Sequence, residues 1–376
     1  MKVSTTLRRT YRFVVKNFYS KPREFIKLVS DRSFYCSQSY YPEYKANSVL
    51  SNFIYQVGQV LKYGRTNSFL FMYGLDVKHK ESRKDYLNYA HFMERRDFLN
   101  NLDDKHNSTC LLRNKLYFDI IAKSLGIPSP RILAYSLSGK LFVWSHDHFA
   151  EQTSLESLAS FGCESFFCKE TKGECGSGIF ILHVDDSKRF SIEGKDADQE
   201  EVFNIICRSD YVVQEVVTQH DAMSRLYSGS INTLRLVTVR SLKDGIIHVM
   251  PSILRIGTNG SIVDNTSQGG IAVGFDLDTG RLHEDGFYKP EFGRRVQAHP
   301  NSGVVFHDFY IPFIKEAEEQ AIKFHSFLKD IHSIGWDIAI GQDGPIFIEG
   351  NDNWEINGPQ VGNHGLRKEF EEYFYK

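Results

Sequence analysis

Residues 335–352 read GWDIAIGQDGPIFIEGND, and this stretch decides the fold that we expect for the chain. Two apolar segments, 336–340 and 346–349, flank a five-residue loop at 341–345. Short apolar runs separated by a glycine-containing loop predict two antiparallel strands joined as a hairpin.

Three oxygen-bearing side chains fall on one face of this hairpin. If Ile340 pairs with Ile346, Asp337 lies directly opposite Glu349, and Asn351 projects from the same face as Glu349. Two carboxylates that face each other among apolar neighbours repel, and a divalent cation removes that conflict. Two carboxylates and an amide suit Mg²⁺. We therefore favour a metal site over the alternative, a hairpin with an ordinary polar outer face.

A glycine-rich segment lies at 166–182 and reads FFCKETKGECGSGIFIL. An apolar strand that carries Lys169 enters a loop with Gly173, Gly176 and Gly178, and a second strand leaves it. Glycines allow main-chain amides to converge on an anion, and lysine adds a point charge. A strand follows the loop where a dinucleotide fingerprint or a Walker loop would continue as a helix. The alternative is a plain glycine-rich hairpin turn, although lysine is unexpected on an apolar strand.

Other polar side chains interrupt apolar segments or begin them. Lys115 opens a predicted helix, and its spacing alone indicates an ordinary exposed lysine. Gln214 and Glu215 interrupt an apolar strand, either as readers of an adenine edge or as edge-strand polar groups. Arg235 and Arg255 each interrupt a predicted strand. An arginine buried there needs a bidentate partner, which is either a phosphate or a local carboxylate.

The remaining sequence separates into helical and antiparallel parts. Residues 46–104 read as helical, with apolar side chains at three- and four-residue spacing at Leu50, Phe53, Ile54, Val57 and Leu61. Further predicted elements are a helix at 115–125, strands within 132–142, 165–170, 179–184, 211–217, 231–240, 246–256 and 271–275, and an amphipathic helix through 313–331. Segregated helices and hairpins predict an α+β fold and not a doubly wound sheet.

Composition excludes several classes of protein. The 45 basic and 47 acidic side chains give a net charge of −2, so no overall field recruits nucleic acid. No apolar run approaches the length of a membrane span, and the N-terminus lacks the apolar core of a secretory signal. The six cysteines form no C-x-x-C pair, so we expect reduced thiols and a cytoplasmic location.

The first 32 residues are basic, with nine lysine and arginine side chains against two acidic ones. Apolar side chains at Phe13, Val14, Phe18, Phe25 and Ile26 are compatible with a short amphipathic element. A peripheral membrane contact is one interpretation. A solvated helix packed on the first lobe is the interpretation that we favour.

Taken in chain order, these features resemble the ATP-grasp superfamily of carboxylate–amine ligases. The segments SINTLRLVTV (230–239), DNTSQGGIAVGFD (264–276) and GWDIAIGQDGPIFIEGNDNWE (335–355) are more similar still to its sugar-transfer-associated branch. The resemblance covers about 110–365 and implies two α+β subdomains that clamp ATP. It divides the chain into a helical N-terminal region at 1–110, a lid subdomain at 111–217 and a large subdomain at 218–376.

The resemblance also implies site residues. The nucleotide contacts would be Lys115 and Lys169 at the phosphates, Gly173, Gly176, Ser177 and Gly178 in the lid, Gln214, Glu215, Val216 and Val217 at adenine with Glu215 on its amine, and Asp221 at the ribose, where Gln219 and His220 compete. Arg235 and Arg255 would act with Lys169 in catalysis, Asn265, Gly269 and Gly270 would line the acceptor site, and Asp337, Glu349 and Asn351 would hold two Mg²⁺ ions or Mn²⁺.

The implied activity is ATP-dependent amide formation through an acyl-phosphate. By analogy with the branch, the acid would be a uronic-acid sugar in capsule or surface-polysaccharide synthesis, and the amine an amino acid or amino sugar. One alternative is a kinase on the same scaffold that phosphorylates a hydroxyl group. Another is a non-catalytic protein that binds a nucleotide or a glycan.

Overall fold

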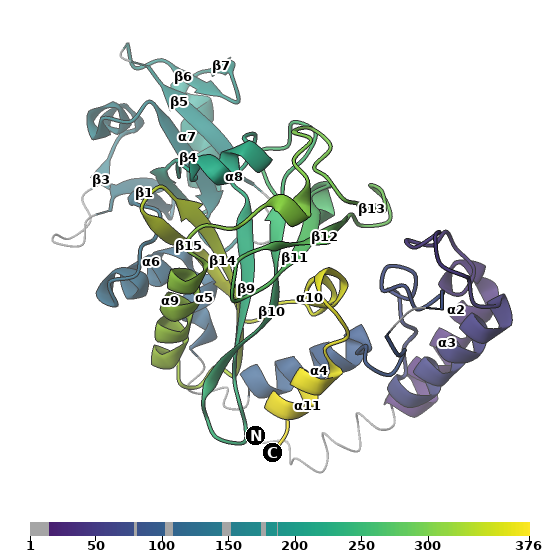
Figure 1. The fold of residues 1–376 in the computed structure, drawn as a ribbon. Helices are drawn as coiled ribbons and strands as arrows, with labels where there is room; N and C mark the ends of the chain where they lie inside the picture. The colour runs from purple at the N-terminus through teal and green to yellow at the C-terminus, as the bar shows by residue number, and fades with distance from the viewer. Residues whose placement is uncertain (1–14, 79–80, 102–107, 145–151, 174–177, 186) are drawn as a thin grey trace.

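Two antiparallel sheets form the body of the chain, and helices lie on their faces and at one end (Figure 1). The computed structural model describes residues 15–78, 81–101, 108–144, 152–173, 178–185 and 187–376. This arrangement of helices and antiparallel sheets confirms the predicted α+β class.

The elements follow the predicted order. The helical elements are the π-helical η1 (Val15–Ser20), α2 (Lys21–Ser30), η2 (Arg32–Phe34), α3 (Val49–Tyr63), α4 (Tyr89–Asn100), α5 (Thr109–Arg113), α6 (Lys115–Ser124), η3 (Leu155–Phe161), α7 (Gln199–Arg208), α8 (Asp221–Leu226), η4 (Thr266–Gln268), η5 (Phe306–Asp308), α9 (Ile314–Phe327), α10 (Asn357–Gly362) and α11 (Arg367–Tyr373). The strands are β1 (Ile132–Leu137), β2 (Lys140–Val143), β3 (Gln152–Thr153), β4 (Ser165–Glu170), β5 (Phe180–Val184), β6 (Phe190–Ile192), β7 (Lys195–Ala197), β8 (Tyr211–Glu215), β9 (Thr233–Arg240), β10 (Ile247–Ile256), β11 (Ile271–Phe275), β12 (Leu282–Phe287), β13 (Arg295–Val296), β14 (Ser333–Gly341) and β15 (Gly344–Asn351).

The first sheet has the strand order β3-β2-β1-β8-β4-β5-β6-β7. Its core contains Phe166 and Leu182 of the sheet together with Val202 and Ile206 of α7. Strands β4 and β5 form the hairpin that carries the glycine-rich loop, and β8 pairs with β4 on its other side.

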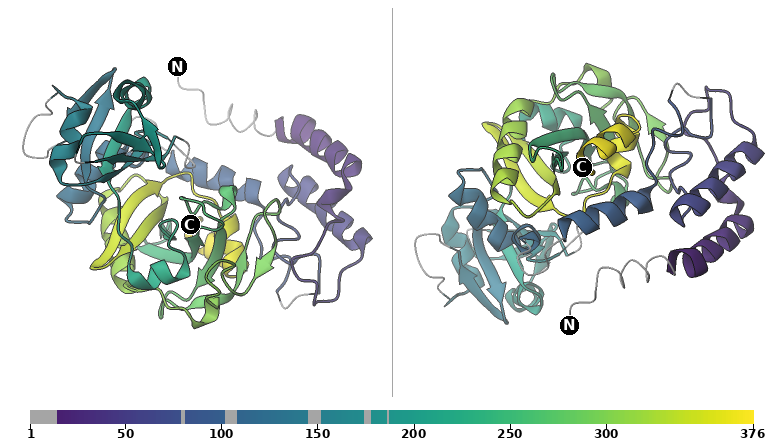
Figure 2. Two further views of the ribbon diagram at one scale, coloured as in Figure 1. Left: turned by 90° about the horizontal axis from the view of Figure 1, so that it is seen from above. Right: turned by 90° about the horizontal axis from the view of Figure 1, so that it is seen from below.

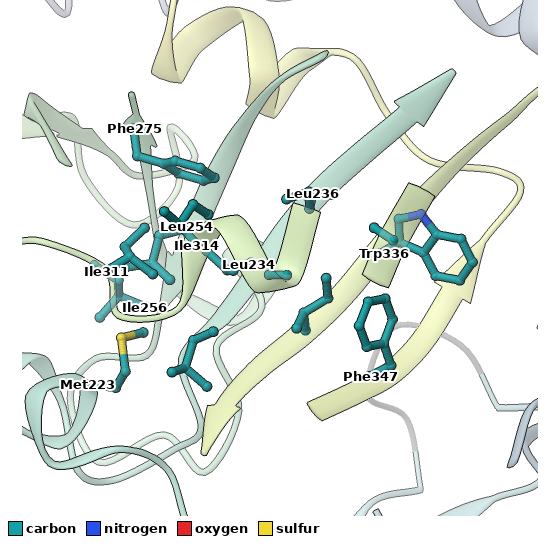
Figure 3. Packing of buried hydrophobic residues seen from close by; sticks show 14 of the residues in the cluster. Met223, Leu234, Leu236, Leu254, Ile256, Phe275, Ile311, Ile314, Trp336 and Phe347 are labelled. Atoms are coloured by element: carbon teal, nitrogen blue, oxygen red, sulfur yellow. The ribbon is translucent and has the colours of Figure 1, made fainter. Parts of the chain in front are cut away.

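The second sheet has the strand order β13-β12-β11-β10-β9-β14-β15. All nine residues of β14 are buried, so this strand is covered on both faces. Trp336 and Ile338 lie on the face that α9 covers, where the Trp336 ring contacts Phe324 and Phe347 (Figure 3). Because side chains alternate along a strand, Asp337 points to the opposite face.

The β14–β15 hairpin differs from the prediction in its register. The pairing of Asp337 with Glu349 is confirmed. Nearer the turn, however, Ile340 pairs with Pro345 and not with the expected Ile346, and only residues 342–343 connect the two strands. The predicted five-residue loop is therefore wrong.

A β-bulge explains the shift in register. Phe347 pairs with Ile338 and Glu349 pairs with Asp337, so Ile348 is one extra residue on β15. In a regular strand Phe347 and Glu349 would share one face. The bulge instead leaves Phe347 in the core and turns Glu349 to the face that carries Asp337.

Helices α2 and α3 lie at one end of the molecule, away from both sheets (Figures 1 and 2). Helices α3 and α4 confirm part of the predicted helical region, but no helix connects them. In α3, Leu50, Ile54 and Leu61 are exposed, whereas Asn52, Gln56, Val60 and Tyr63 are buried. Nowhere in the described part of the chain is a helix both long and apolar enough to cross a bilayer.

Candidate functional site

A row of three charged side chains crosses neighbouring strands of the second sheet. Asp337 of β14 pairs with Arg235 of β9 on one side and with Glu349 of β15 on the other. Asn351 is paired with Gly335 and lies on the same face as Glu349. Strand register therefore brings together the three predicted metal ligands and one of the two predicted arginines.

Asp337 is held by both strand arginines. Arg235 donates from Nε to Asp337 Oδ1 at 2.5 Å and from Nη2 to Oδ2 at 3.1 Å, and Arg255 Nη2 lies 3.0 Å from Oδ2. Burial opposes ionisation of this carboxyl, but the two guanidinium groups outweigh burial and lower its pKa. Of the partners that the sequence left open for Arg235 and Arg255, the local carboxylate is the one observed.

The pKa of Glu349 is shifted in the opposite direction. Burial and the neighbouring Asp337 charge raise its pKa, although Lys115 and Lys169 act against the shift. Asn351 Nδ2 lies 3.4 Å from Glu349 Oε1 and 3.5 Å from Asp337 Oδ2. Asp337 and Glu349 thus lie close enough that a second negative charge is disfavoured. Together with the Asn351 amide, these two carboxylates fit a hard divalent cation.

Lys115 and Lys169 face these carboxylates across the cavity. Asn114 caps α6 through its side chain and fixes the start of the helix at Lys115, whose Nζ donates to Gly173 O at 2.8 Å. Lys169 is buried on β4, and burial together with the Lys115 charge lowers its pKa to about 8. Gly173 lines the cavity, whereas Gly178 packs beside Tyr211 and Glu170.

Two predicted lid residues, Gly176 and Ser177, lie outside the described residues. The structure therefore does not place them relative to the cavity.

The predicted adenine segment meets the cavity at two of its four residues. Gln214 and Val217 line it. The side chain of Glu215 points away and pairs with Arg131 at 2.8 Å, and Val216 is partly exposed outside the lining. The predicted contact of the Glu215 carboxylate with the adenine amine therefore does not fit this arrangement, and main-chain groups of the segment are the nearer candidates.

The three ribose candidates lie outside the cavity lining. Asp221 begins α8 and accepts from Gln342 at 2.9 Å. Gln219 is buried and holds the following loop through Tyr227 O and Ser230 O, and His220 caps α8. Each side chain has a structural partner that the sequence did not reveal.

The predicted acceptor residues divide into one lining residue and two loop glycines. Asn265 lines the cavity and accepts from Arg255 at 3.3 Å. Gly269 adopts a left-handed conformation with φ 93°, and a Cβ on Gly270 would lie 2.3 Å from the carbonyl oxygen of Asp264. These glycines shape the loop but do not line the cavity.

Three lining residues were missed by the sequence reasoning. Buried Asp264 accepts from Thr233 N at 2.9 Å and lies 3.6 Å from Arg255 Nε. Arg113 forms a bidentate pair with Asp352 at 2.9 and 2.6 Å. Asp264 and Asp352 adjoin motifs already noted, and this adjacency was the signal in the sequence that could have identified them. The partner of Asp352, Arg113, is 239 residues away in sequence.

The lining groups named above open into one cavity of about 410 Å³ between the two sheets. Lys115, Lys169 and Gln214 line one part, and the β9–β14–β15 row forms another. The remaining wall is largely apolar and includes Met72, Ile253, Ile262 and Phe287, with Lys289 beside them. The cavity thus joins a cationic region, an acidic region and an apolar region.

A family model described as sugar-transfer associated ATP-grasp matches residues 89–373. Among solved structures, N5-carboxyaminoimidazole ribonucleotide synthetase in an ADP complex is 13% identical with a TM-score of 0.37, over 67% of this chain and 50% of that one. D-alanyl-alanine synthetase A from Vibrio cholerae is 12% identical with a TM-score of 0.37, over 65% and 56%. The ATP-grasp ligase PsnB with its minimal precursor is 13% identical with a TM-score of 0.37, over 68% and 60%. The chain thus spans half to three fifths of these proteins, and no curated protein matches.

Proposed function

The chain belongs to the sugar-transfer associated ATP-grasp family, and we propose that it is an ATP-dependent carboxylate–amine ligase. The observation that carries this proposal is the convergence of two lysines, two facing carboxylates and two arginines on one cavity. Forming an amide from an acid and an amine with ATP requires groups that contact the phosphates and other groups that hold the acyl carbon. Because ATP-dependent synthesis needs intracellular nucleotide, the proposal places the protein in the cytoplasm.

The nucleotide end is assigned to Lys115 and Lys169, with the Gln214–Val217 segment at adenine. Asp337, Glu349 and Asn351 would hold two Mg²⁺ ions, which supply neutralisation of the phosphates when bound. To bind a cation, Asp337 must either share its oxygens between the cation and the two arginines or release the arginines. The raised pKa of Glu349 supports this assignment, since a cation would relieve the repulsion that causes it.

The reaction then proceeds in two steps. A carboxylate oxygen of the acid bonds to the γ-phosphorus of ATP, and the bond to the bridging oxygen breaks as ADP leaves. The amine bonds to the acyl carbon, phosphate leaves, and the amine nitrogen loses a proton to give the amide. Arg235 and Arg255 are placed to stabilise charge on the acyl-phosphate, and Asn265 fixes the position of Arg255.

The residues at the acceptor end of the cavity support the assignment of an acid substrate that carries a ring. Phe287 and Met72 offer flat apolar walls, and Lys289 offers a cation for a carboxylate. We therefore assign the acid as a uronic-acid sugar of a surface polysaccharide and the amine as an amino acid or amino sugar.

A hydroxylamine trap tests the reaction. The protein is incubated with ATP, Mg²⁺, hydroxylamine and a panel of uronic acids and their nucleotide sugars, and hydroxamate is measured beside ADP. A ligase forms hydroxamate with its acid, and Arg255→Ala should lose it. ADP without hydroxamate would indicate the kinase alternative, and no ADP with any combination would indicate a non-catalytic protein, so either outcome overturns the proposal.

A further inference from the structure

Helix α3 presents its apolar side to solvent. Leu50, Ile54 and Leu61 recur at helical spacing, and they are 65%, 61% and 63% exposed. A surface helix ordinarily turns such a stripe toward the core. In α3, Val60 and Tyr63 are buried, but the stripe formed by Leu50, Ile54 and Leu61 faces away from them, which leaves three large aliphatic side chains in water.

Specific hydrogen bonds hold α3 in this orientation. Its inner side carries buried Gln56, which donates to Phe34 O at 2.7 Å and to Asn67 O at 2.9 Å, and accepts from Asn67 N at 2.8 Å. Asn52, one turn earlier, is buried on the same side. Rotating the apolar stripe inward would break these bonds and bury unsatisfied amides. The exposed stripe is therefore a built feature of this end of the fold.

Helix α2 and the preceding η1 add a second apolar surface. Phe18, Tyr19, Phe25, Ile26 and Val29 are each at least 44% exposed. Helices α2 and α3 contact each other, and both lie at the end of the molecule away from the sheets (Figure 2). Exposed aromatic and aliphatic side chains concentrated on two adjacent helices mark an interaction site.

The charge around these helices selects the kind of partner. Residues 15–75 carry eight lysine and arginine side chains against three acidic ones, although the whole chain has a net charge of −2. No aspartate or glutamate occurs between residues 44 and 75. Arg23 and Lys27 on α2 and Lys62 on α3 are exposed. The partner should therefore be anionic and should accept apolar side chains.

We propose that the exposed apolar and basic surface of η1, α2 and α3 docks on the surface of an anionic phospholipid bilayer. Basic side chains beside exposed aromatic and aliphatic groups characterise helices that lie in the membrane interface. A second copy of this chain is disfavoured because it would bring two positively charged surfaces together. This docking is peripheral and does not depend on the ligase proposal.

Vesicle co-sedimentation of the full-length protein tests the proposal. Vesicles contain phosphatidylcholine alone or phosphatidylcholine mixed with phosphatidylglycerol. We expect binding to the mixed vesicles only, weakened by high salt. Ile54→Glu and Ile26→Glu should each lower the partition coefficient at least about tenfold. Each change removes an aliphatic group that the bilayer would bury and adds a negative charge that the anionic lipids repel.

Matched controls separate this surface from general effects. Ile246→Glu makes the same change at a comparably exposed isoleucine on the β9–β10 turn, and it should bind as wild type does. Arg23→Gln with Lys27→Gln should weaken binding roughly tenfold, whereas Lys188→Gln with Lys195→Gln should not. Because these sites are exposed, all variants should keep the wild-type melting temperature.

Two results would overturn the proposal. The first is that the protein stays in the supernatant with both vesicle types. The other is a concentration-dependent dimer that Ile54→Glu converts to monomer, because it would assign the surface to a second copy.

Discussion

Glu349 illustrates how a functional carboxylate is kept at a cost to the folded protein. Its pKa is raised by burial and by the Asp337 charge, so the ionised form is disfavoured relative to the unfolded chain. Such a group lowers stability at neutral pH, where it must ionise. Binding of a cation would remove this cost.

We expect Glu349→Gln to raise the melting temperature of the ligand-free protein and to abolish Mg²⁺-dependent ADP formation. The amide keeps the shape of the side chain but removes the repelled charge, a common exchange of activity for stability. Calorimetric unfolding measures the first effect and an assay of released ADP the second, and a Mn²⁺ titration followed by electron paramagnetic resonance measures cation binding directly. Glu372→Gln, an exposed substitution of the same kind, should change neither. A Glu349→Gln protein that binds Mn²⁺ as wild type does would refute the metal assignment.

Lys169 links nucleotide affinity to pH. Burial and the Lys115 charge lower its pKa to about 8, so the side chain loses its proton between neutral pH and pH 9 in the protein without nucleotide. Only the charged form attracts a phosphate. The affinity for Mg²⁺–ADP should therefore fall by about tenfold from pH 7 to pH 9.

Calorimetric titration of Mg²⁺–ADP at the two pH values tests the role of Lys169. Lys169→Arg keeps its charge throughout and should show no such fall. Lys169→Ala should bind weakly at both pH values. If the wild-type affinity is the same at pH 7 and pH 9, Lys169 does not contact the phosphates.

At the scale of elements, the sequence predicted which strands exist better than how they align. Apolar runs marked β9 and β10 within two residues of their ends, whereas β14 begins three residues before the predicted strand. The bulge at Ile348 could not be predicted, because residues 346–348 are all apolar and either face of β15 accepts them. In α3 the spacing shows which residues share a side of the helix, but it does not show which side faces inward.

The candidate site follows the same division. Local spacing was enough to place Asp337, Glu349 and Asn351 on one face. The pairing of Arg235 with Asp337 depends on β9 lying beside β14, which is a long-range contact that no local pattern encodes. Arg113 was missed for this reason, because its partner Asp352 is 239 residues away in sequence.

Behind the β9–β14–β15 row, a buried chain of hydrogen bonds connects sheet and helix. Trp336 Nε1 donates to Thr238 Oγ1 at 2.8 Å, and the Thr238 hydroxyl lies 2.8 Å from His325 Nδ1 on α9. Thr238→Val keeps the volume but leaves an indole N–H and an imidazole nitrogen without partners. We expect it to destabilise the protein by about 2–4 kcal/mol in urea unfolding.

Thr238→Ser provides the rescue for this prediction. It retains both hydrogen bonds and removes one methyl group, so it should cost only about 1 kcal/mol. Equal stability of the valine and serine variants would show that packing, and not this chain of hydrogen bonds, connects α9 to the sheet.

At the scale of the whole molecule, the N-terminal region is part of the cavity. Met72 lines the cavity wall beside Phe287, and Tyr40 donates to Tyr288 O at 3.0 Å. Gln360 of α10 donates to the Tyr73 hydroxyl at 3.1 Å. A membrane-docked N-terminal region would therefore hold the acceptor end of the cavity near the lipid surface.

Two buried histidines set the acid limit of the folded state. His325 and His332 are kept neutral, and burial lowers their pKa values to about 3 and about 4. A depressed histidine pKa contributes stability that is present above the unfolded value near 6.5 and is lost as pH falls toward the folded value. Each histidine should therefore remove about 2 kcal/mol between pH 7 and pH 5.

Urea unfolding at pH 7 and pH 5 should show this loss, and His325→Gln should reduce it by about 2 kcal/mol because glutamine does not titrate. His364 provides a control of opposite sign, since its hydrogen bond to Glu369 raises its pKa. Its stabilisation is present in acid and fades as pH rises, so His364→Gln should enlarge the acid loss slightly. If His325→Gln loses as much stability between pH 7 and pH 5 as wild type does, the pKa of His325 is not lowered in the folded protein, and other groups such as His332 must account for the loss.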